Sequence, residues 1–412
     1  MNPKIELLVD KENERVILND GARSTITSLF SGCRVNFLFG AGFSANILGI
    51  LNNNEVIFEA LQKYQAKDEN ERKKVTILTA FMYWSFFNSC IKPISEKTTK
   101  DDLFDQYKEF GNIVYRIFSE RGNPSLDRQF NIFTTNYDPI IELIFDHSNC
   151  ICNDGFEGRI QPRFSTDNYS KTYYRHAMFS NRKVEIPSVN LFKLHGSVTW
   201  ENDDGDIIYQ HYCDKISAFF DTYLKLFNNL SKIDDLLTTN QPDEAKEQIK
   251  SLIDDLLTAN QPDEAKEHIK SLFAKRIFDT LLDKAEAYDN FIKEYKKSFL
   301  IVNPTKEKFS DTLLNKNYYE LLRIFSNELE KENTLMVANG FSFRDEHILD
   351  LVKRSMVNPY LKILIFVYQE SEIEDMQKRF GDVKNNNITY IALKGEKLSL
   401  TYFNQILSHI HS

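Results

Sequence analysis

The chain has 412 residues, and its 51 lysines and arginines against 60 aspartates and glutamates give a formal net charge of −9. The negative field of such a chain repels polyanions, so we expect no direct, specific binding of nucleic acid. Uninterrupted apolar runs such as residues 81–84 are far shorter than the roughly 20 residues of a membrane helix, and the charged first segment lacks the apolar core of a signal peptide. We therefore expect a cytoplasmic protein outside membranes. The 5 cysteines, an odd number without a framework pattern, fit a reducing compartment.

The first part of the chain alternates short apolar runs with helical patterns. After a preamble, residues 1–29, a first strand is expected at residues 34–39. Residues 52–100 are expected to form a largely helical insertion, and residues 103–118 place apolar side chains at the spacing of an amphipathic helix. The elements that follow are expected, in order, at residues 130–134 (strand), 155–187 (a long polar loop bordering a crevice) and 189–194 (strand).

The second part contains a helical segment and then returns to strands. Within residues 214–297, which are rich in helix formers and charges, residues 233–252 recur as residues 253–272. The copies differ only at Thr239/Ala259 and Gln248/His268. Two copies are too few for a solenoid, so we interpret them as a recent duplication in an exposed helical arm, with a dedicated recognition surface as the alternative. The later elements are expected at residues 299–302, 334–338, 362–368 and 388–393 (strands) and 317–331 (helix).

This alternation of strands and helices indicates an α/β fold with a Rossmann-like, doubly wound parallel sheet. We assign residues 30–213 and 298–412 to the sheet domain and residues 214–297 to a helical insertion. Ligands of open parallel sheets bind in a crevice at the carboxyl ends of the strands. Polar residues that directly follow a strand are therefore the first candidates for a functional site.

Three expected strands end in clusters of small or polar residues. These runs are VNFLFGAGFS at residues 35–44, FTTNYD at residues 133–138 and LFKLHGS at residues 191–197. Gly40 and Gly42 would let the backbone approach a pyrophosphate while the following helix turns its amides toward it, although a tight turn alone can also require glycine. Together the three runs indicate a nucleotide site.

In this order the runs resemble motifs of the sirtuin family: GAGFS resembles its dinucleotide loop, TTNYD its Thr-x-Asn-x-Asp run, and KLHGS the stretch that carries its active-site histidine. A fourth run, ANGFSFRDEHI at residues 338–348, resembles a signature of the bacterial sirtuin-like branch. The resemblance extends over nearly the whole chain. It implies that NAD+ contacts Gly40, Ala41, Gly42, Ser44, Thr135, Asn136, Gly340 and Ser342.

One feature of the sirtuin deacylases has no counterpart in this sequence. Those enzymes bind a structural zinc through two Cys-x-x-Cys pairs, and no such pair is formed by Cys33, Cys90, Cys150, Cys152 and Cys213. We therefore expect no zinc and no acyl-lysine cleft shaped by a zinc module. The resemblance is closer to the sirtuin-like NADases of bacterial anti-phage defence, which hydrolyse NAD+ to nicotinamide and ADP-ribose. It also implies control by self-assembly into an oligomer or by a partner, a HerA-type ATPase.

Cleavage of the nicotinamide bond requires a site that holds the ribose, stabilises an oxocarbenium-like transition state and aims a water molecule. Asn136 carries an amide that both donates and accepts, which suits it to positioning water or ribose hydroxyls, although this run is also turn-prone. Asp138 either orients Asn136 or the nicotinamide carboxamide, or caps the helix after Pro139, and the roles can coexist. His195 is the candidate general base because histidine can accept a proton at neutral pH; a buried structural histidine is the alternative.

Other residues near these motifs receive smaller roles, and other functions stay open. We expect Asp345 to be a helix cap or loop organiser, His347 to be a packing residue and Asn303 to contact the distal ribose. A module that senses NAD+ or an ADP-ribose-like signal without turnover is one alternative, and it would need neither an aimed water nor a base. A sirtuin deacylase or ADP-ribosyltransferase is another, and the missing cysteine pairs argue against the deacylase.

Overall fold

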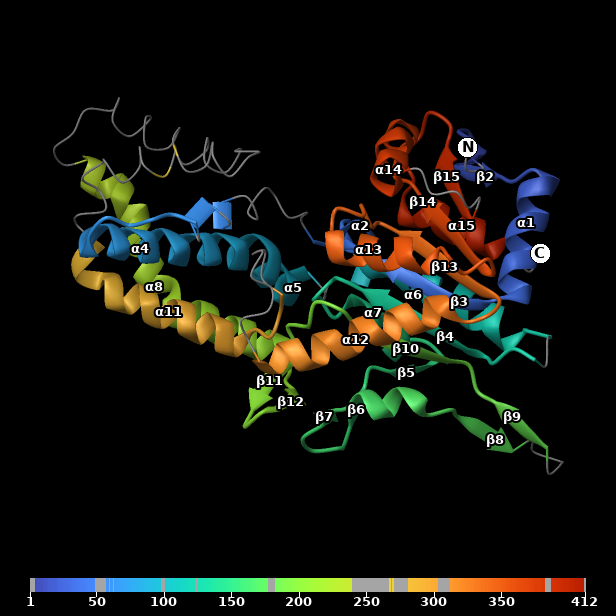
Figure 1. The fold of residues 1–412 in the computed structure, drawn as a ribbon, viewed down its shortest axis with the longest axis horizontal. Helices are drawn as coiled ribbons and strands as arrows, with labels where there is room; N and C mark the ends of the chain where they lie inside the picture. Colours follow the sequence, from blue (N-terminus) through green and yellow to red (C-terminus); the bar gives the residue numbers. More distant parts are fainter. Residues whose placement is uncertain are drawn as a thin grey trace. The chain divides into compact units, whose positions relative to one another are not determined.

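The computed structural model describes residues 4–48, 57–58, 60–61, 63–97, 101–122, 125–176, 182–238, 267, 269, 281–302, 312–381 and 387–410. The chain divides into two compact units, coloured by sequence in Figure 1. The sheet unit comprises Met1–Ile47, Lys100–Gly196 and Asn315–Ser412, and the helical unit comprises Leu48–Thr99 and Ser197–Leu314. These boundaries differ from the expected ones, because the helical stretch before residue 100 belongs to the same unit as the later helical segment, and the chain leaves the sheet unit directly after Gly196.

The sheet unit contains a nine-stranded sheet in the order β2-β1-β15-β14-β13-β3-β4-β10-β5. Neighbouring strands are parallel except for β1 with β2. The strands are β1 (Lys4–Asp10), β2 (Arg15–Ile17), β3 (Arg34–Phe39), β4 (Gln129–Thr134), β5 (Ile151–Asn153), β10 (Ser188–Lys193), β13 (Thr334–Asn339), β14 (Leu361–Phe366) and β15 (Ile388–Leu393). The expected α/β class with a Rossmann-like, mostly parallel sheet is thus confirmed.

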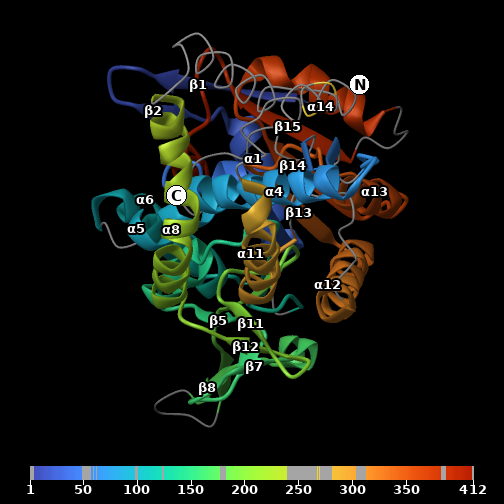
Figure 2. The same ribbon diagram turned by 90° about the vertical axis from the view of Figure 1, so that its left-hand side faces the viewer.

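Helices lie on both faces of this sheet (Figure 2), as its largely apolar central strands require. On one face Phe37 of β3 packs against Phe30 and Phe110, and on the other Phe133 of β4 packs against Phe325. The helices of this unit are α1 (Asp20–Gly32), α2 (Ala41–Ser44), α6 (Asp101–Ser119), α7 (Ile140–Asp146), α12 (Thr312–Glu330), α13 (Glu346–Ser355), α14 (Ile373–Phe380) and α15 (Leu400–Ser408). Phe30 and Phe110 come from α1 and α6, and Phe325 comes from α12.

Several expectations about single elements were wrong. The strand expected at residues 299–302 is only an isolated bridge at Ile301, in a buried segment of the helical unit. The preamble is part of the sheet, because β1 pairs with β15. The polar loop carries short elements: β6 (Phe156–Glu157), β7 (Arg163–Phe164), a 3-10 turn (Thr166–Ser170), β8 (Tyr174–His176) and β9 (Lys183–Glu185).

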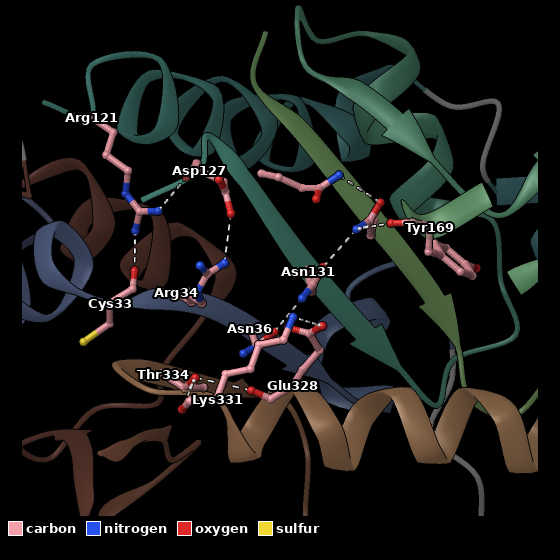
Figure 3. Close-up of polar contacts among 12 residues, drawn as sticks. Cys33, Arg34, Asn36, Arg121, Asp127, Asn131, Tyr169, Glu328, Lys331 and Thr334 are labelled. Atoms are coloured by element: carbon pink, nitrogen blue, oxygen red, sulfur yellow. Dashed lines mark hydrogen bonds and ion pairs between the residues drawn. The ribbon is translucent and has the colours of Figure 1, made fainter. Parts of the chain in front are cut away.

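A ladder of four asparagine side chains crosses the sheet on the face that α12 covers. Asn36, Asn131, Asn190 and Asn153 are register partners on β3, β4, β10 and β5. Three hydrogen bonds join them in strand order. Asn131 Nδ2 donates to Asn36 Oδ1 over 2.8 Å, Asn190 Nδ2 to Asn131 Oδ1 over 3.2 Å, and Asn153 Nδ2 to Asn190 Oδ1 over 2.9 Å. Figure 3 shows Asn36 and Asn131 joined in this way, with the chain of polar contacts continuing toward Tyr169. Buried amides that satisfy one another in series hold the four strands in register.

The helical unit packs its helices around aromatic side chains. Trp84 stacks on Phe227 with ring centroids 4.5 Å apart, and Phe291 lies edge-on to both. Its elements are α4 (Glu69–Phe86), a π-helical turn (Phe87–Ile91), α5 (Lys92–Lys97), β11 (Trp200–Asp203), β12 (Asp206–Tyr209), α8 (Tyr212–Thr238) and α11 (Ala285–Ser298). Most of the duplicated segment lies outside the described residues, and so does Asn303.

Candidate active site

The loops after four neighbouring strands meet at the carboxyl edge of the sheet. They are the glycine loop after β3 (residues 40–44), the asparagine loop after β4 (135–139), the histidine turn after β10 (194–196) and the FSF loop after β13 (340–345). The register places Phe39 beside Thr134 and Thr134 beside Lys193, so these strands end side by side. All four motifs singled out in the sequence therefore lie at one edge of one unit.

The glycine loop and the FSF loop touch through their backbones. The Gly42 amide donates to the Gly340 carbonyl oxygen over 2.9 Å, and a Cβ on Gly340 would lie 2.2 Å from the Phe43 nitrogen. Gly340 has φ +63°, a conformation that favours glycine. The close approach of the two loops thus explains why glycine is needed at Gly40, Gly42 and Gly340 on steric grounds alone. A steric reason was the alternative to a pyrophosphate contact for Gly40 and Gly42.

The structure shows which backbone amides of the glycine loop are already bonded, while their contact with a pyrophosphate stays a prediction. The helix after the glycines, α2, has only 4 residues. The Gly42 and Phe43 amides already donate to carbonyl oxygens within the two loops. Ala41, Gly42 and Ser342 are exposed, whereas Gly40 and Ser44 are buried. A ligand at this edge would therefore meet the outer surface of the glycine loop.

Asn136 connects the asparagine loop to the glycine loop. Its Nδ2 donates to the Gly40 carbonyl oxygen over 3.0 Å and to Ser44 Oγ over 2.9 Å, and the side chain is largely buried. Its backbone amide donates to Thr134 Oγ1, and the amide of the half-buried Thr135 donates to the Phe39 carbonyl oxygen. Both amide hydrogens of Asn136 are therefore used within the protein, and its Oδ1 accepts no hydrogen bond from any described residue.

Asp138 extends this chain of hydrogen bonds. Ser44 Oγ donates to Asp138 Oδ2 over 2.9 Å, and the Ile140 amide donates to Asp138 Oδ1 over 3.0 Å. The second bond satisfies the amide of Ile140, the first residue of α7, as a cap would, although the N-cap residue is Pro139, which makes no side-chain capping bond. The first bond links Asp138 to Asn136 through one hydroxyl, and a contact with the nicotinamide carboxamide stays a prediction.

His195 lies next to Asp345, its Nε2 3.0 Å from Asp345 Oδ2, with the side chains 13% and 12% exposed. The contact joins the histidine turn to the FSF loop across the two strands between them. Asp345 occupies the N-cap position of α13 but makes no side-chain capping bond, so its carboxylate serves the histidine turn instead. Gly196, at φ +75°, makes the turn that follows His195. His347 is exposed and thus not the packing residue that was expected.

The sequence reasoning missed Lys193 and Glu142. Lys193 Nζ lies 3.0 Å from Glu142 Oε2, and the side chains are 3% and 17% exposed. Lys193 also donates to the Asp138 backbone carbonyl oxygen. Burial raises the pKa of Glu142 to about 7, against the opposing effect of the Lys193 charge. A lysine within the otherwise apolar run LFKL, residues 191–194, was the signal that could have revealed the pair.

The other chemistry-bearing residues form no comparable cluster. No three histidine, cysteine or acidic side chains of the described ranges are placed to hold a metal ion. All five cysteines are free, and burial raises the pKa of the Cys150 and Cys152 thiols. Among the helices that the structure describes, none combines the length and apolarity needed to cross a membrane.

No protein-family model matches the chain, and a search of curated proteins found no match either.

Proposed function

We propose that the protein is an NAD+ glycohydrolase, which cleaves the bond between nicotinamide and ribose and releases nicotinamide and ADP-ribose. The observation that carries this proposal is the hydrogen-bonded chain from Gly40 through Asn136 and Ser44 to Asp138, with His195 on the adjoining strand end. Gly40, Ser44 and Asn136 of this chain are among the residues that the sirtuin resemblance assigns to NAD+, and their loops follow the carboxyl ends of strands, where open parallel sheets bind ligands. NAD+ is the substrate here, and the chemistry requires no metal.

The two candidate catalytic groups have different tasks in this proposal. Asn136 Oδ1 accepts a hydrogen bond from a ribose hydroxyl or from the attacking water, because its Nδ2 is held by Gly40 and Ser44. Such an anchored amide keeps its oxygen in one direction without further loss of side-chain entropy on binding.

His195 accepts the proton. Water adds to the anomeric carbon as the bond to nicotinamide breaks, nicotinamide leaves with the bonding electrons, and the water proton moves to the imidazole. The Asp345 carboxylate, 3.0 Å from Nε2, stabilises the imidazolium that this transfer creates. The ring nitrogen that faces away from Asp345 is then the one that takes the proton.

The biological setting that we propose rests on the resemblance to defence NADases. An enzyme that depletes NAD+ would harm its own cell if it were always active, so its activity has to depend on assembly. We propose a cytoplasmic homo-oligomer, controlled by a HerA-type ATPase partner, that depletes NAD+ during phage infection.

A non-catalytic NAD+ or ADP-ribose sensor is the second candidate. It is favoured by one observation: the Asn136 amide nitrogen makes only structural bonds, to Gly40 and Ser44, which a pure binding module would also need. The two candidates differ in whether nicotinamide is released.

The decisive experiment is to incubate the purified chain with NAD+, alone and together with a candidate ATPase partner, and to quantify nicotinamide by chromatography. We expect release that needs no acylated peptide and that withstands metal chelators. NAD+ binding without any release, with and without the partner, would favour the sensor, and a requirement for an acyl-lysine peptide would favour a deacylase.

A further inference from the structure

Lys193 is the last residue of β10, and it is one of the most deeply buried charged side chains among the described residues. Its ammonium group donates to the Asp138 backbone carbonyl oxygen and lies 3.0 Å from the Glu142 carboxylate. A buried ion pair is often no more stable than a pair of apolar side chains of the same size, because both charges lose their hydration. Stability alone therefore does not account for a lysine at this position.

We infer that Lys193 is a positioning residue, which holds the asparagine loop in its reactive geometry through the carbonyl oxygen of Asp138; the inference rests on the proposed function. The hydrogen bond from Lys193 fixes the Asp138 backbone carbonyl, while the Asp138 carboxylate accepts hydrogen bonds from Ser44 Oγ and the Ile140 amide. Ser44 in turn receives a hydrogen bond from Asn136. One ammonium group thus supports the hydrogen-bonded chain that aims Asn136 Oδ1.

The role of Glu142 in this arrangement is to compensate the charge of Lys193. It lies in the first turn of α7, and the described residues give its carboxylate an ion pair with Lys193 and no hydrogen bond or ion pair with the glycine loop. Other ionisable groups around the pair are Asp138, Asp146, Asp154, Cys150, Cys152 and Tyr169. Burial raises the pKa of Asp154 as it does that of Glu142, so this pocket disfavours negative charge that lysine does not balance.

The test uses a variant in which no buried charge is left unpaired. Lys193→Met with Glu142→Gln removes both charges, replaces the ammonium with an apolar group of similar length, and keeps an amide at position 142. Because the large penalty of an uncompensated buried charge is absent, we expect this double variant to fold, with a melting temperature close to that of the wild type. Comparison with Lys193→Met alone separates the loss of the Lys193 hydrogen bond from the penalty of leaving the Glu142 charge unpaired.

Two readouts report on the loop. The first is hydrogen exchange of the backbone amides of Asn136 and Ile140, which donate hydrogen bonds to the side chains of Thr134 and Asp138. This measurement does not depend on enzymatic activity. We expect their exchange to be at least 10-fold faster in the double variant, relative to amides in the middle of β4. The second is turnover of NAD+, for which we expect kcat to fall at least 10-fold with KM changed less than 3-fold.

Lys215 provides a matched control. It is a half-buried lysine that also donates to backbone carbonyl oxygens, those of Val198 and Trp200, but it belongs to the helical unit. Lys215→Met should lower the melting temperature without changing the exchange of the Asn136 and Ile140 amides. Unchanged exchange at these amides in the folded double variant would overturn the inference, whether or not the wild type hydrolyses NAD+. Faster exchange in a protein whose wild type has no NADase activity would uphold the positioning role and refute the proposed function.

Discussion

At the scale of single residues, Asn136 and His195 differ in how they are tied to the protein. Asn136 makes two side-chain hydrogen bonds to the glycine loop, whereas the Nε2 of His195 lies against the Asp345 carboxylate of the FSF loop. Both are proposed to serve the same reaction, but the Asn136 side chain is held by two hydrogen bonds to buried partners and His195 by one ion pair. Substitutions at the two positions should therefore separate catalysis from structure.

We expect His195→Ala and Asn136→Ala each to lower NAD+ turnover by at least about 100-fold, the usual scale for a positioned catalytic group. Asn136→Ala should in addition lower the free energy of unfolding by about 1–2 kcal/mol, because Gly40 and Ser44 lose a buried partner. Steady-state kinetics and urea denaturation measure the two effects. Full activity in both variants would place the chemistry elsewhere and favour the sensor.

Gly340 offers a second residue-scale prediction. Gly340→Ala should destabilise the protein by at least about 2 kcal/mol more than Gly395→Ala does. Both glycines have positive φ, +63° and +69°, but a Cβ at Gly340 meets the glycine loop backbone, whereas no described heavy atom lies within 4 Å of a Cβ at Gly395. The pair therefore separates the clash from the strain of the φ angle, and equal losses in denaturation experiments would show that the loops can move apart.

At the scale of elements, the asparagine ladder is the clearest polar device in the sheet. We expect Asn131→Leu to lower the free energy of unfolding by about 2–4 kcal/mol, because Asn36 Oδ1 loses its donor and Asn190 Nδ2 keeps only the longer bond of 3.5 Å to the Tyr169 carbonyl oxygen. Asn36→Leu should cost less. It leaves one neighbour unpaired, and it removes a buried Nδ2 that has no hydrogen bond to the described residues. Chemical denaturation of both variants checks the order, and a reversed order would contradict the ladder's role.

The contact between α7 and β10 predicts a pH dependence of stability. Burial raises the pKa of Glu142 from its ordinary value of 4.5 to about 7, so the folded state binds more protons than the unfolded state between these values. This group's contribution to stability therefore decreases as pH rises from about 4.5 to about 7. Compared with Glu142→Gln, the wild type should lose up to about 3 kcal/mol over this window. Parallel curves for the two proteins from pH 5 to pH 8 would mean that Glu142 titrates normally.

At the scale of the whole molecule, the sheet was largely predictable and the division into units was not. Strands such as 34–39 and 388–393 are predominantly apolar runs, interrupted by Asn36 and Thr389, a local pattern that sequence displays directly. The pairing of β1 with β15 joins residues near opposite ends of the chain, and no local pattern specifies it. The segment at 299–302 is as apolar as a strand, but it is buried and forms only the isolated bridge at Ile301. Whether such an apolar run becomes a strand depends on its tertiary surroundings.

The candidate site was predictable to a similar extent. Small and polar residues at strand ends, Asn136 and His195 among them, are visible as breaks in apolar runs. The contact of His195 with Asp345 depends on two segments 150 positions apart, and the pairing of Lys193 with Glu142 depends on the register of β10 with β4. Partners of this kind follow from topology and not from spacing along the chain.

The duplicated segment leads to a prediction at this scale as well. Deletion of residues 253–272 removes one complete repeat and restores the same junction, since Leu252 and Leu272 are equivalent. We expect a folded protein that binds NAD+ with unchanged affinity, because one copy carries its own turn and cap signals. Calorimetric titration with NAD+ measures this. Lost NAD+ binding would show that the arm supports the crevice, and lost assembly with NAD+ binding intact would identify it as a partner-facing surface.

The asparagine ladder also bears on the order in which the chain assembles. Each hydrogen bond of the ladder is one rung. The two asparagines of a rung are separated along the chain by 37 positions between β5 and β10, 59 between β10 and β4, and 95 between β4 and β3. Since the entropic cost of closing a loop grows with its length, we expect the shortest rung to form first and the rung to Asn36 last. The last rung docks β3, the strand that carries the glycine loop. In a nascent or refolding chain, the edge that we propose as the NAD+ site should therefore form late, after β4, β10 and β5 have already associated.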